Sequence, residues 1–182
     1  SGGSWVIGGE QDDIDGGYAT NQYFSGQIAE VIVYKDYLSN AEINVVANYL
    51  NLKYGDADLT LGNDGFNNTT AGTYTQDFVG IGMESDGVMS TRGKGGLYLS
   101  ASDDIAAGNY IFGAHNGATN NEASINRGTT VTNSTTAVAA WNRMYYIQKT
   151  GTQKAVITFD LPEAFENGDF FASTNNYVLL ER

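Results

Sequence analysis

The sequence predicts a mostly β protein, an antiparallel β-sandwich with one amphipathic helix at about residues 39–54. Many short strand-like segments are separated by turn residues, and only one stretch has a helical period. Because helices do not alternate with the strands, we do not expect a parallel sheet. The chain has 182 residues, 41% of them hydrophobic, so it can bury a substantial core.

The helix is predicted by its caps and its apolar stripe. Ser39 and Glu42 have the spacing of a capping box, and Gly55 stands where a left-handed C-cap is wanted. The apolar residues between these caps recur at helical spacing, and they are Ile43, Val46, Ala47, Leu50 and Tyr54. We expect this apolar stripe to be buried against a sheet formed by residues 56–182.

The strands are predicted by short runs of β-branched and aromatic residues between Gly, Asn and Asp. Residues 27–34, with Ile28, Val31, Ile32 and Val33, indicate a buried strand that leads into the helix. The other predicted strands are residues 4–8, 77–82, 95–101, 109–113, 143–149, 154–160, 169–173 and 177–181. Residues 115–136, rich in Asn and Thr, are expected to form a long exposed loop.

A change of composition after Gly55 predicts two parts, residues 1–55 and residues 56–182. The first part has too few strands to close a sandwich by itself, and the second is expected to be a β-rich sandwich domain. Strand-like sequence at both ends suggests a piece of a longer polypeptide. Its partner would then be the remainder of that polypeptide, or a neighbouring copy that pairs through a strand.

Composition excludes several classes of function. Nine Lys and Arg against 21 Asp and Glu give a net charge of −12, which opposes nucleic acid and anionic membranes as partners. The sequence has no Cys and one His, which removes thiolate and most zinc chemistry. A Cys-free acidic chain favours an exported protein on the bacterial cell surface, and no apolar run predicts membrane insertion.

A cluster of carboxylates is the candidate metal site. Asp12, Asp13 and Asp15 follow Glu10 within a glycine-flanked segment, which could turn several oxygens toward one point. Calcium prefers such oxygen ligands, so Ca²⁺ is the cofactor that this segment could hold. A solvated acidic loop is the alternative interpretation.

Aromatic residues form the candidate ligand site. Tyr18, Tyr23, Tyr74 and Trp141 stand in settings typical of exposed side chains. Their rings could stack on sugars while neighbouring Asn and Asp bind the hydroxyls, so glycans are candidate partners. The alternative is that these tyrosines are ordinary sheet residues.

No catalytic group can be assembled from the sequence. His115, in a turn-like setting after a predicted strand, is interpreted as a hydrogen-bonded structural residue. The alternating acids of glycoside hydrolases on one strand are missing, and no base, nucleophile and orienting group can be combined. We expect a protein that is not an enzyme.

Three motifs in residues 24–55 resemble the closing strand and terminal helix of bacterial laminin-G/concanavalin-A-like domains: FSGQIAEVIVY at 24–34, LSNAEI at 38–43 and YLNLKYG at 49–55. The later motifs resemble an uncharacterised β-rich domain that commonly follows the laminin-G-like one in large surface proteins exported through the type IX secretion system. They are VGIG at 79–82, YIFGAHNG at 110–117, NRMYYIQKTG at 142–151 and YVLL at 177–180.

This resemblance implies secretion, a sandwich of the lectin or jelly-roll type, and no established catalytic residues. The predicted function is a noncatalytic extracellular module of a large bacterial surface or filament-forming protein, with a role in adhesion or structure. The alternative is a lectin-like carbohydrate-binding module, assisted by calcium.

Overall fold

The computed structural model describes residues 7–11, 18–55, 65–67, 72–117, 125–129, 138–141 and 143–159. The chain divides into two compact units, Ser1–Asp36 and Tyr37–Arg182. The helix therefore belongs to the larger unit. The sequence boundary after Gly55 rests on composition and stays a prediction.

The smaller unit contains an antiparallel hairpin of β1 (Gly9–Gln11) and β2 (Tyr18–Tyr23). The prediction that residues 27–34 form a strand buried within this chain is wrong, because these residues belong to no sheet among those that the described residues form. Their apolar side chains are exposed, and they are Ile28, Val31, Ile32, Val33 and Tyr34. A strand needs a neighbouring strand as well as a suitable hydropathy pattern, and the pattern alone cannot supply that neighbour.

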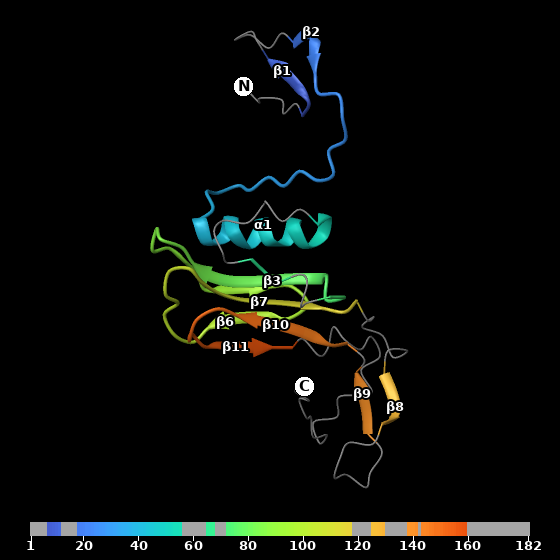
Figure 1. Cartoon of the computed structure of the whole chain (residues 1–182), viewed down its shortest axis with the longest axis vertical. Helices are drawn as coiled ribbons and strands as arrows, with labels where there is room; N and C mark the ends of the chain where they lie inside the picture. The colour runs from blue at the N-terminus through green and yellow to red at the C-terminus, as the bar shows by residue number, and fades with distance from the viewer. Residues whose placement is uncertain are drawn as a thin grey trace. The chain divides into compact units, whose positions relative to one another are not determined.

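The larger unit contains a four-stranded and a three-stranded antiparallel sheet, a separate two-stranded sheet, and the helix α1 (Asn40–Tyr54) (Figure 1). The four-stranded sheet has the order β10-β7-β3-β4, made of β3 (Gln76–Met83), β4 (Met89–Ser90), β7 (Asn109–His115) and β10 (Tyr145–Lys149). The three-stranded sheet has the order β11-β6-β5, made of β5 (Arg92–Lys94), β6 (Tyr98–Ala101) and β11 (Ala155–Thr158). The prediction of a mostly β antiparallel protein with one long helix is confirmed for the described residues.

Predicted and observed strands agree best in the larger unit. The predicted strands at 77–82, 109–113, 143–149 and 154–160 appear as β3, β7, β10 and β11. The loop expected at 115–136 is wrong in part, because β8 (Ile125–Thr129) lies within it and pairs with β9 (Val138–Trp141). The predicted strands at 169–173 and 177–181 lie outside the described residues.

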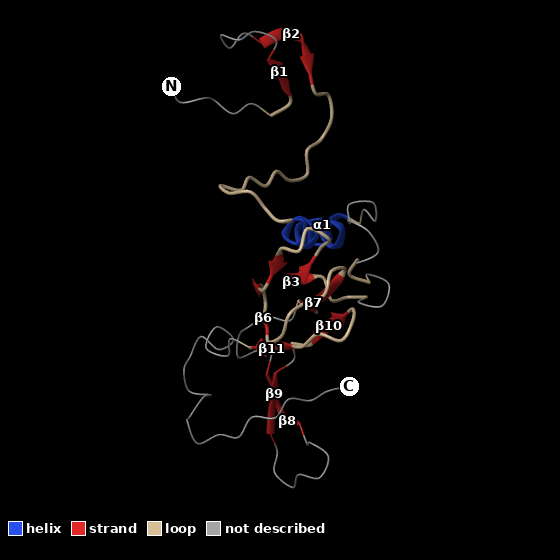
Figure 2. Cartoon of the chain, turned by 90° about the vertical axis from the view of Figure 1, so that its left-hand side faces the viewer, coloured by secondary structure: helices blue, strands red, loops and turns tan. Residues whose placement is uncertain are grey.

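The β10-β7-β3-β4 sheet is covered on both faces, so its strands send buried side chains in two directions. Figures 1 and 2 show α1 lying across the side of β3 and β7 that is remote from β6 and β11. On the helix side the buried cluster contains Ala41, Phe66, Tyr110, Phe112 and Ala114. On the other side the cluster shared with the second sheet contains Val79, Ile81, Leu97, Leu99, Ile105 and Ile111. This double cover explains the nearly continuous burial of β3 and β7.

Two glycines of β3 make room for aromatic rings from β7. Gly82 pairs with Tyr110 and Gly80 pairs with Phe112 across the ladder. A Cβ at Gly80 would lie 2.7 Å from Phe112 Cδ1, and one at Gly82 would overlap the Tyr110 ring. The two rings stack with centroids 5.1 Å apart, over backbone that carries no side chain. Both glycines are interior positions of β3, within the predicted strand at 77–82.

The caps of α1 are confirmed. The Glu42 N–H donates to Ser39 Oγ at 3.3 Å, and the Ser39 N–H donates back to Glu42 Oε2 at 2.8 Å. Gly55, with φ of 78°, donates its N–H to the Asn51 carbonyl oxygen at 2.7 Å. The Asn40 N–H at the start of the helix donates to Asp86 Oδ2 at 3.1 Å, which ties the helix to the β3–β4 turn.

The predicted buried face of α1 is wrong. Within the apolar stripe, Ile43 is 41% exposed and Tyr54 is 45% exposed. The buried helix residues are instead Ala41, Asn44, Asn48 and Asn51. Asn44 and Asn48 are 0% and 1% exposed, so these amides lie toward the sheet, beside Ala41, Val45 and Leu52.

Hydrogen bonds explain why asparagines tolerate this burial. Asn44 Nδ2 donates to Glu84 Oε1 at 3.3 Å, and the Tyr110 hydroxyl donates to the same oxygen at 2.7 Å. Asn48 Nδ2 donates to the Asn44 carbonyl oxygen at 2.9 Å, while Asn48 Oδ1 accepts the Phe66 N–H at 2.6 Å. Buried amides that are paired in this way avoid most of the desolvation penalty.

Candidate functional site

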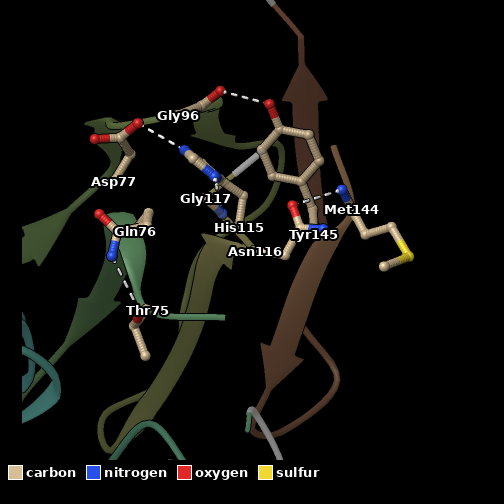
Figure 3. A network of polar contacts seen from close by, with 9 residues as sticks. All are labelled: Thr75, Gln76, Asp77, Gly96, His115, Asn116, Gly117, Met144 and Tyr145. Atoms are coloured by element: carbon tan, nitrogen blue, oxygen red, sulfur yellow. Dashed lines mark hydrogen bonds and ion pairs between the residues drawn. The ribbon is translucent and has the colours of Figure 1, made fainter. Parts of the chain in front are cut away.

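His115 is the centre of the candidate site, at the end of β7. Its side chain is 2% exposed. Nε2 lies 2.6 Å from Asp77 Oδ2, and Nδ1 accepts the Gly117 N–H at 3.0 Å (Figure 3). Because the Gly117 N–H can only donate, Nδ1 carries the lone pair and Nε2 carries the proton that is given to Asp77. The interpretation of His115 as a hydrogen-bonded residue is confirmed.

A β-bulge brings Asp77 to the imidazole. Gln76 pairs with His115 and Val79 pairs with Gly113, so β3 contains one residue more than β7 between these two pairs. Asp77 takes a left-handed φ of 48°, which Asp and Asn tolerate better than most residues. The bulge thus aims the Asp77 carboxylate at His115, and the Asp77 carbonyl oxygen accepts the Gly96 N–H at 3.0 Å.

Gly96 and Tyr145 close the other side of the ring. The Tyr145 hydroxyl donates to the Gly96 carbonyl oxygen at 2.9 Å, and its ring meets His115 edge-on with centroids 5.7 Å apart. A Cβ at Gly96 would lie 2.5 Å from His115 Cδ2, so a side chain there would displace the imidazole. The glycine-rich segment 93–96 therefore serves close packing.

Tyr145 stays a neutral hydrogen-bond donor at neutral pH. Burial raises the pKa of its phenol above the ordinary value of 10.0, and the charge of Asp77 acts in the same direction. Arg143 opposes this shift in the pKa through a hydrogen bond and its positive charge, and burial outweighs it.

Asn116 and Met144 complete the junction between β7 and β10. The Asn116 N–H donates to the Met144 carbonyl oxygen at 3.1 Å. The Met144 N–H donates to Asn116 Oδ1 at 3.2 Å (Figure 3). We call the whole set the His115 junction, and it consists of Asp77, Gly96, His115, Asn116, Gly117, Met144 and Tyr145.

The His115 junction offers little to an external substrate. The lone pair of the imidazole points at the Gly117 N–H, and the other nitrogen is committed to Asp77. A general base must reach a proton of the bound molecule, so this arrangement does not present one. The geometry instead joins the first residues of β3, the turn before β6, and the facing ends of β7 and β10.

Sequence reasoning found His115 but missed its partners. Asp77 lies 38 positions from His115 in the sequence, and no spacing rule connects them. One signal could have pointed to the bulge: Asp77 is a lone acid at the start of an apolar strand run. The same pattern is equally typical of an exposed side chain at the end of a strand.

The predicted aromatic ligand residues are distributed over both units. Tyr23, at the end of β2, is 61% exposed. Tyr74 is half-buried and packs against Tyr146 with ring centroids 5.9 Å apart. Tyr18 and Trp141 lie in β2 and β9, where the structure describes the strands but not these two side chains. Their role in glycan binding stays a prediction.

The predicted calcium ligands Asp12, Asp13 and Asp15 lie outside the described residues, between β1 and β2 in the sequence. Among the residues that the structure does describe, no group of three or more His, Cys, Asp or Glu is placed to hold a metal ion. Calcium binding by residues 12–15 therefore stays a prediction.

Within the described ranges, no helix combines the length and the apolar character that crossing a membrane requires. Comparisons of the chain with family models, curated proteins and solved structures find no match.

Proposed function

We propose that this chain is a noncatalytic, extracellular module of a large bacterial surface or filament-forming protein, with a role in adhesion or structure. We further propose that residues 27–34 act as an addition strand, which pairs with a sheet edge in the remainder of the same polypeptide or in a neighbouring copy. In this proposal the larger unit is a β-sandwich of the lectin or jelly-roll type with α1 on one outer face.

The exposed apolar sequence of residues 27–34 is the observation that carries this proposal. In an extended chain Ile28, Ile32 and Tyr34 would point to one side, and Val31 and Val33 to the other. All five are at least 38% exposed. A strand that is apolar on both sides fits a sheet covered on both faces. Pairing with such a sheet would bury these side chains.

The outward face of α1 gives independent support for assembly. Ile43 and Tyr54 are exposed there, and Val46 and Leu50 are half-buried. A row of apolar side chains on the outside of a helix is typical of a surface that a partner covers. Both nitrogens of His115 are engaged within the chain, which argues against a role of the imidazole on an external substrate. The Cys-free, acidic composition supports an extracellular location.

Strand addition can be tested by removing one backbone donor. Val31→Pro deletes an N–H from the proposed ladder, whereas Val31→Thr keeps the N–H and the β-branched shape. Light scattering over a range of concentrations should show assembly of the chain and of Val31→Thr, with assembly weakened at least about tenfold in Val31→Pro. Equal behaviour of the two variants would contradict backbone pairing by this segment.

The alternative proposal is a calcium-assisted carbohydrate-binding module, and the exposed ring of Tyr23 is the observation in its favour. A glycan array with and without chelator tests it. Binding that EDTA abolishes and that Tyr23→Ala weakens would favour this alternative over the structural role. A complete lack of binding would leave the structural role preferred.

A further inference from the structure

The single histidine of the chain directs its lone pair at a backbone amide of an Asn–Gly pair. Nδ1 of His115 accepts the N–H of Gly117, whose nitrogen is also the atom that can attack the Asn116 side-chain amide. We propose that the His115 junction promotes succinimide formation at Asn116–Gly117 and so makes this pair a self-modification site. This inference stands independently of the proposed function.

The Asp77–His115 pair supplies the base. Removal of the Gly117 amide proton is needed before its nitrogen becomes a good nucleophile, and Nδ1 lies 3.0 Å from that nitrogen. Asp77 Oδ2, 2.6 Å from Nε2, fixes the tautomer that leaves Nδ1 free to accept the proton. It also stabilises the imidazolium that forms, as an orienting carboxylate does in a catalytic triad.

The Met144 backbone polarises the group that is attacked. Its N–H donates to Asn116 Oδ1 at 3.2 Å, where negative charge develops as the amide carbon becomes tetrahedral. The second bond, from the Asn116 N–H to the Met144 carbonyl oxygen at 3.1 Å, holds the residue against β10. Gly117 has no side chain to obstruct closure of a five-membered ring.

The reaction balances with water as the only added reactant. The Gly117 nitrogen forms a bond to Asn116 Cγ, and its proton passes to His115 Nδ1. The Cγ–Nδ2 bond then breaks, and the imidazolium returns the proton so that ammonia leaves. Water opens the succinimide at either carbonyl, which gives aspartate or isoaspartate at position 116. The product adds one negative charge where the end of β7 faces the start of β10. Isoaspartate also lengthens the main chain at this position.

The wild-type chain itself gives the first test. Peptide mass spectrometry in ¹⁸O-labelled water follows deamidation at Asn116 and at Asn167, which precedes Gly168 and serves as a second Asn–Gly pair. We expect Asn116 to react at least about tenfold faster in the folded chain than in urea, because positioned general-base catalysis is lost on unfolding. A folded rate equal to or below the rate in urea would overturn the proposal, whether or not any variant folds.

Variants separate the base from simple loosening of the junction. His115→Gln can still accept the Gly117 N–H but cannot act as a base of comparable strength, so the folded-state acceleration at Asn116 should disappear. Asp77→Asn should reduce it in part. Tyr146→Phe, which removes only the hydroxyl of a β10 residue outside the His115 junction, should leave the rate within about twofold. Full acceleration in His115→Gln would overturn the role of the imidazole.

Discussion

The two faces of α1 differ in burial in a way that polarity alone would not predict. The face against the sheet contains the buried Asn44, Asn48 and Asn51 beside Ala41, Val45 and Leu52, while the face away from the sheet contains Ile43 and Tyr54, both exposed. The difference shows that an apolar stripe alone does not decide which side of this helix packs on the sheet. Glu84 and the Phe66 N–H accommodate the asparagines, and the apolar residues are left for another surface.

The largest effect is expected when the buried polar face is broken. Asn48→Ala removes the acceptor of the Phe66 N–H and leaves that buried donor unpaired. We expect the free energy of unfolding, measured by urea denaturation, to fall by about 2–3 kcal/mol. A loss below about 0.5 kcal/mol would mean that this polar face contributes no net stability.

The part of β3 and β7 beneath α1 should be almost as sensitive to substitution. Gly82→Ala would drive a methyl group into the Tyr110 ring, whose hydroxyl donates to Glu84 under α1. Overpacking of this kind costs about 1–3 kcal/mol, and we expect the free energy of unfolding to fall by about 2 kcal/mol in the same denaturation experiment. Gly87→Ala is not a suitable control, because Gly87 has a φ of 73° and would be strained for a different reason. Gly113→Ala is the better control, because its added Cβ would come no closer than 3.4 Å to another side chain.

A half-buried polar contact, between Tyr145 and Gly96, allows the comparison to be tested by pH. Tyr145→Phe removes the hydroxyl that donates to the Gly96 carbonyl oxygen, at an expected cost of about 1 kcal/mol near pH 7. Because burial raises the pKa of Tyr145 above 10.0, its contribution to stability is complete below pH 10. The contribution is lost as the pH rises through the folded-state pKa. The difference between wild type and variant should therefore shrink above pH 10, and a constant difference would contradict the buried donor.

The smallest effect is expected on the outward face. Leu50 is half-buried, so Leu50→Ala should cost less than about 1 kcal/mol, compared with about 2–5 kcal/mol for a leucine in a core. The same melts that measure Asn48→Ala give this value. A cost larger than that of Asn48→Ala would reverse the assignment of the two faces.

The existence and the ends of α1 could be predicted because the capping box and Gly55 are local signals. Its buried face could not, because an apolar stripe does not reveal the carboxylate of Glu84, just after β3, or the Tyr110 hydroxyl from β7. Several central strands were predicted from short apolar runs between turn residues. The double cover of β3 and β7 was not, because a continuous apolar run also fits a strand buried on one face.

The candidate site was even less accessible to prediction. The sequence identifies His115 as a structural residue, but its partners come from the β3 bulge, a glycine turn and the start of β10. A one-residue bulge decides which side chain meets the imidazole, and hydropathy carries no information about that choice. The carboxylates of residues 12–15 and the calcium they could hold remain a sequence prediction.

Hydrogen exchange of residues 27–34, in native protein purified from its source, tests the central claim most directly. If this segment is an addition strand, its amides should exchange at least about a hundredfold more slowly than in an unstructured peptide of the same sequence. The β7 amides serve as an internal standard for a buried strand. Exchange of residues 27–34 at the rate of the free peptide, with β7 protected in the same sample, would contradict strand addition and the assembly role built on it.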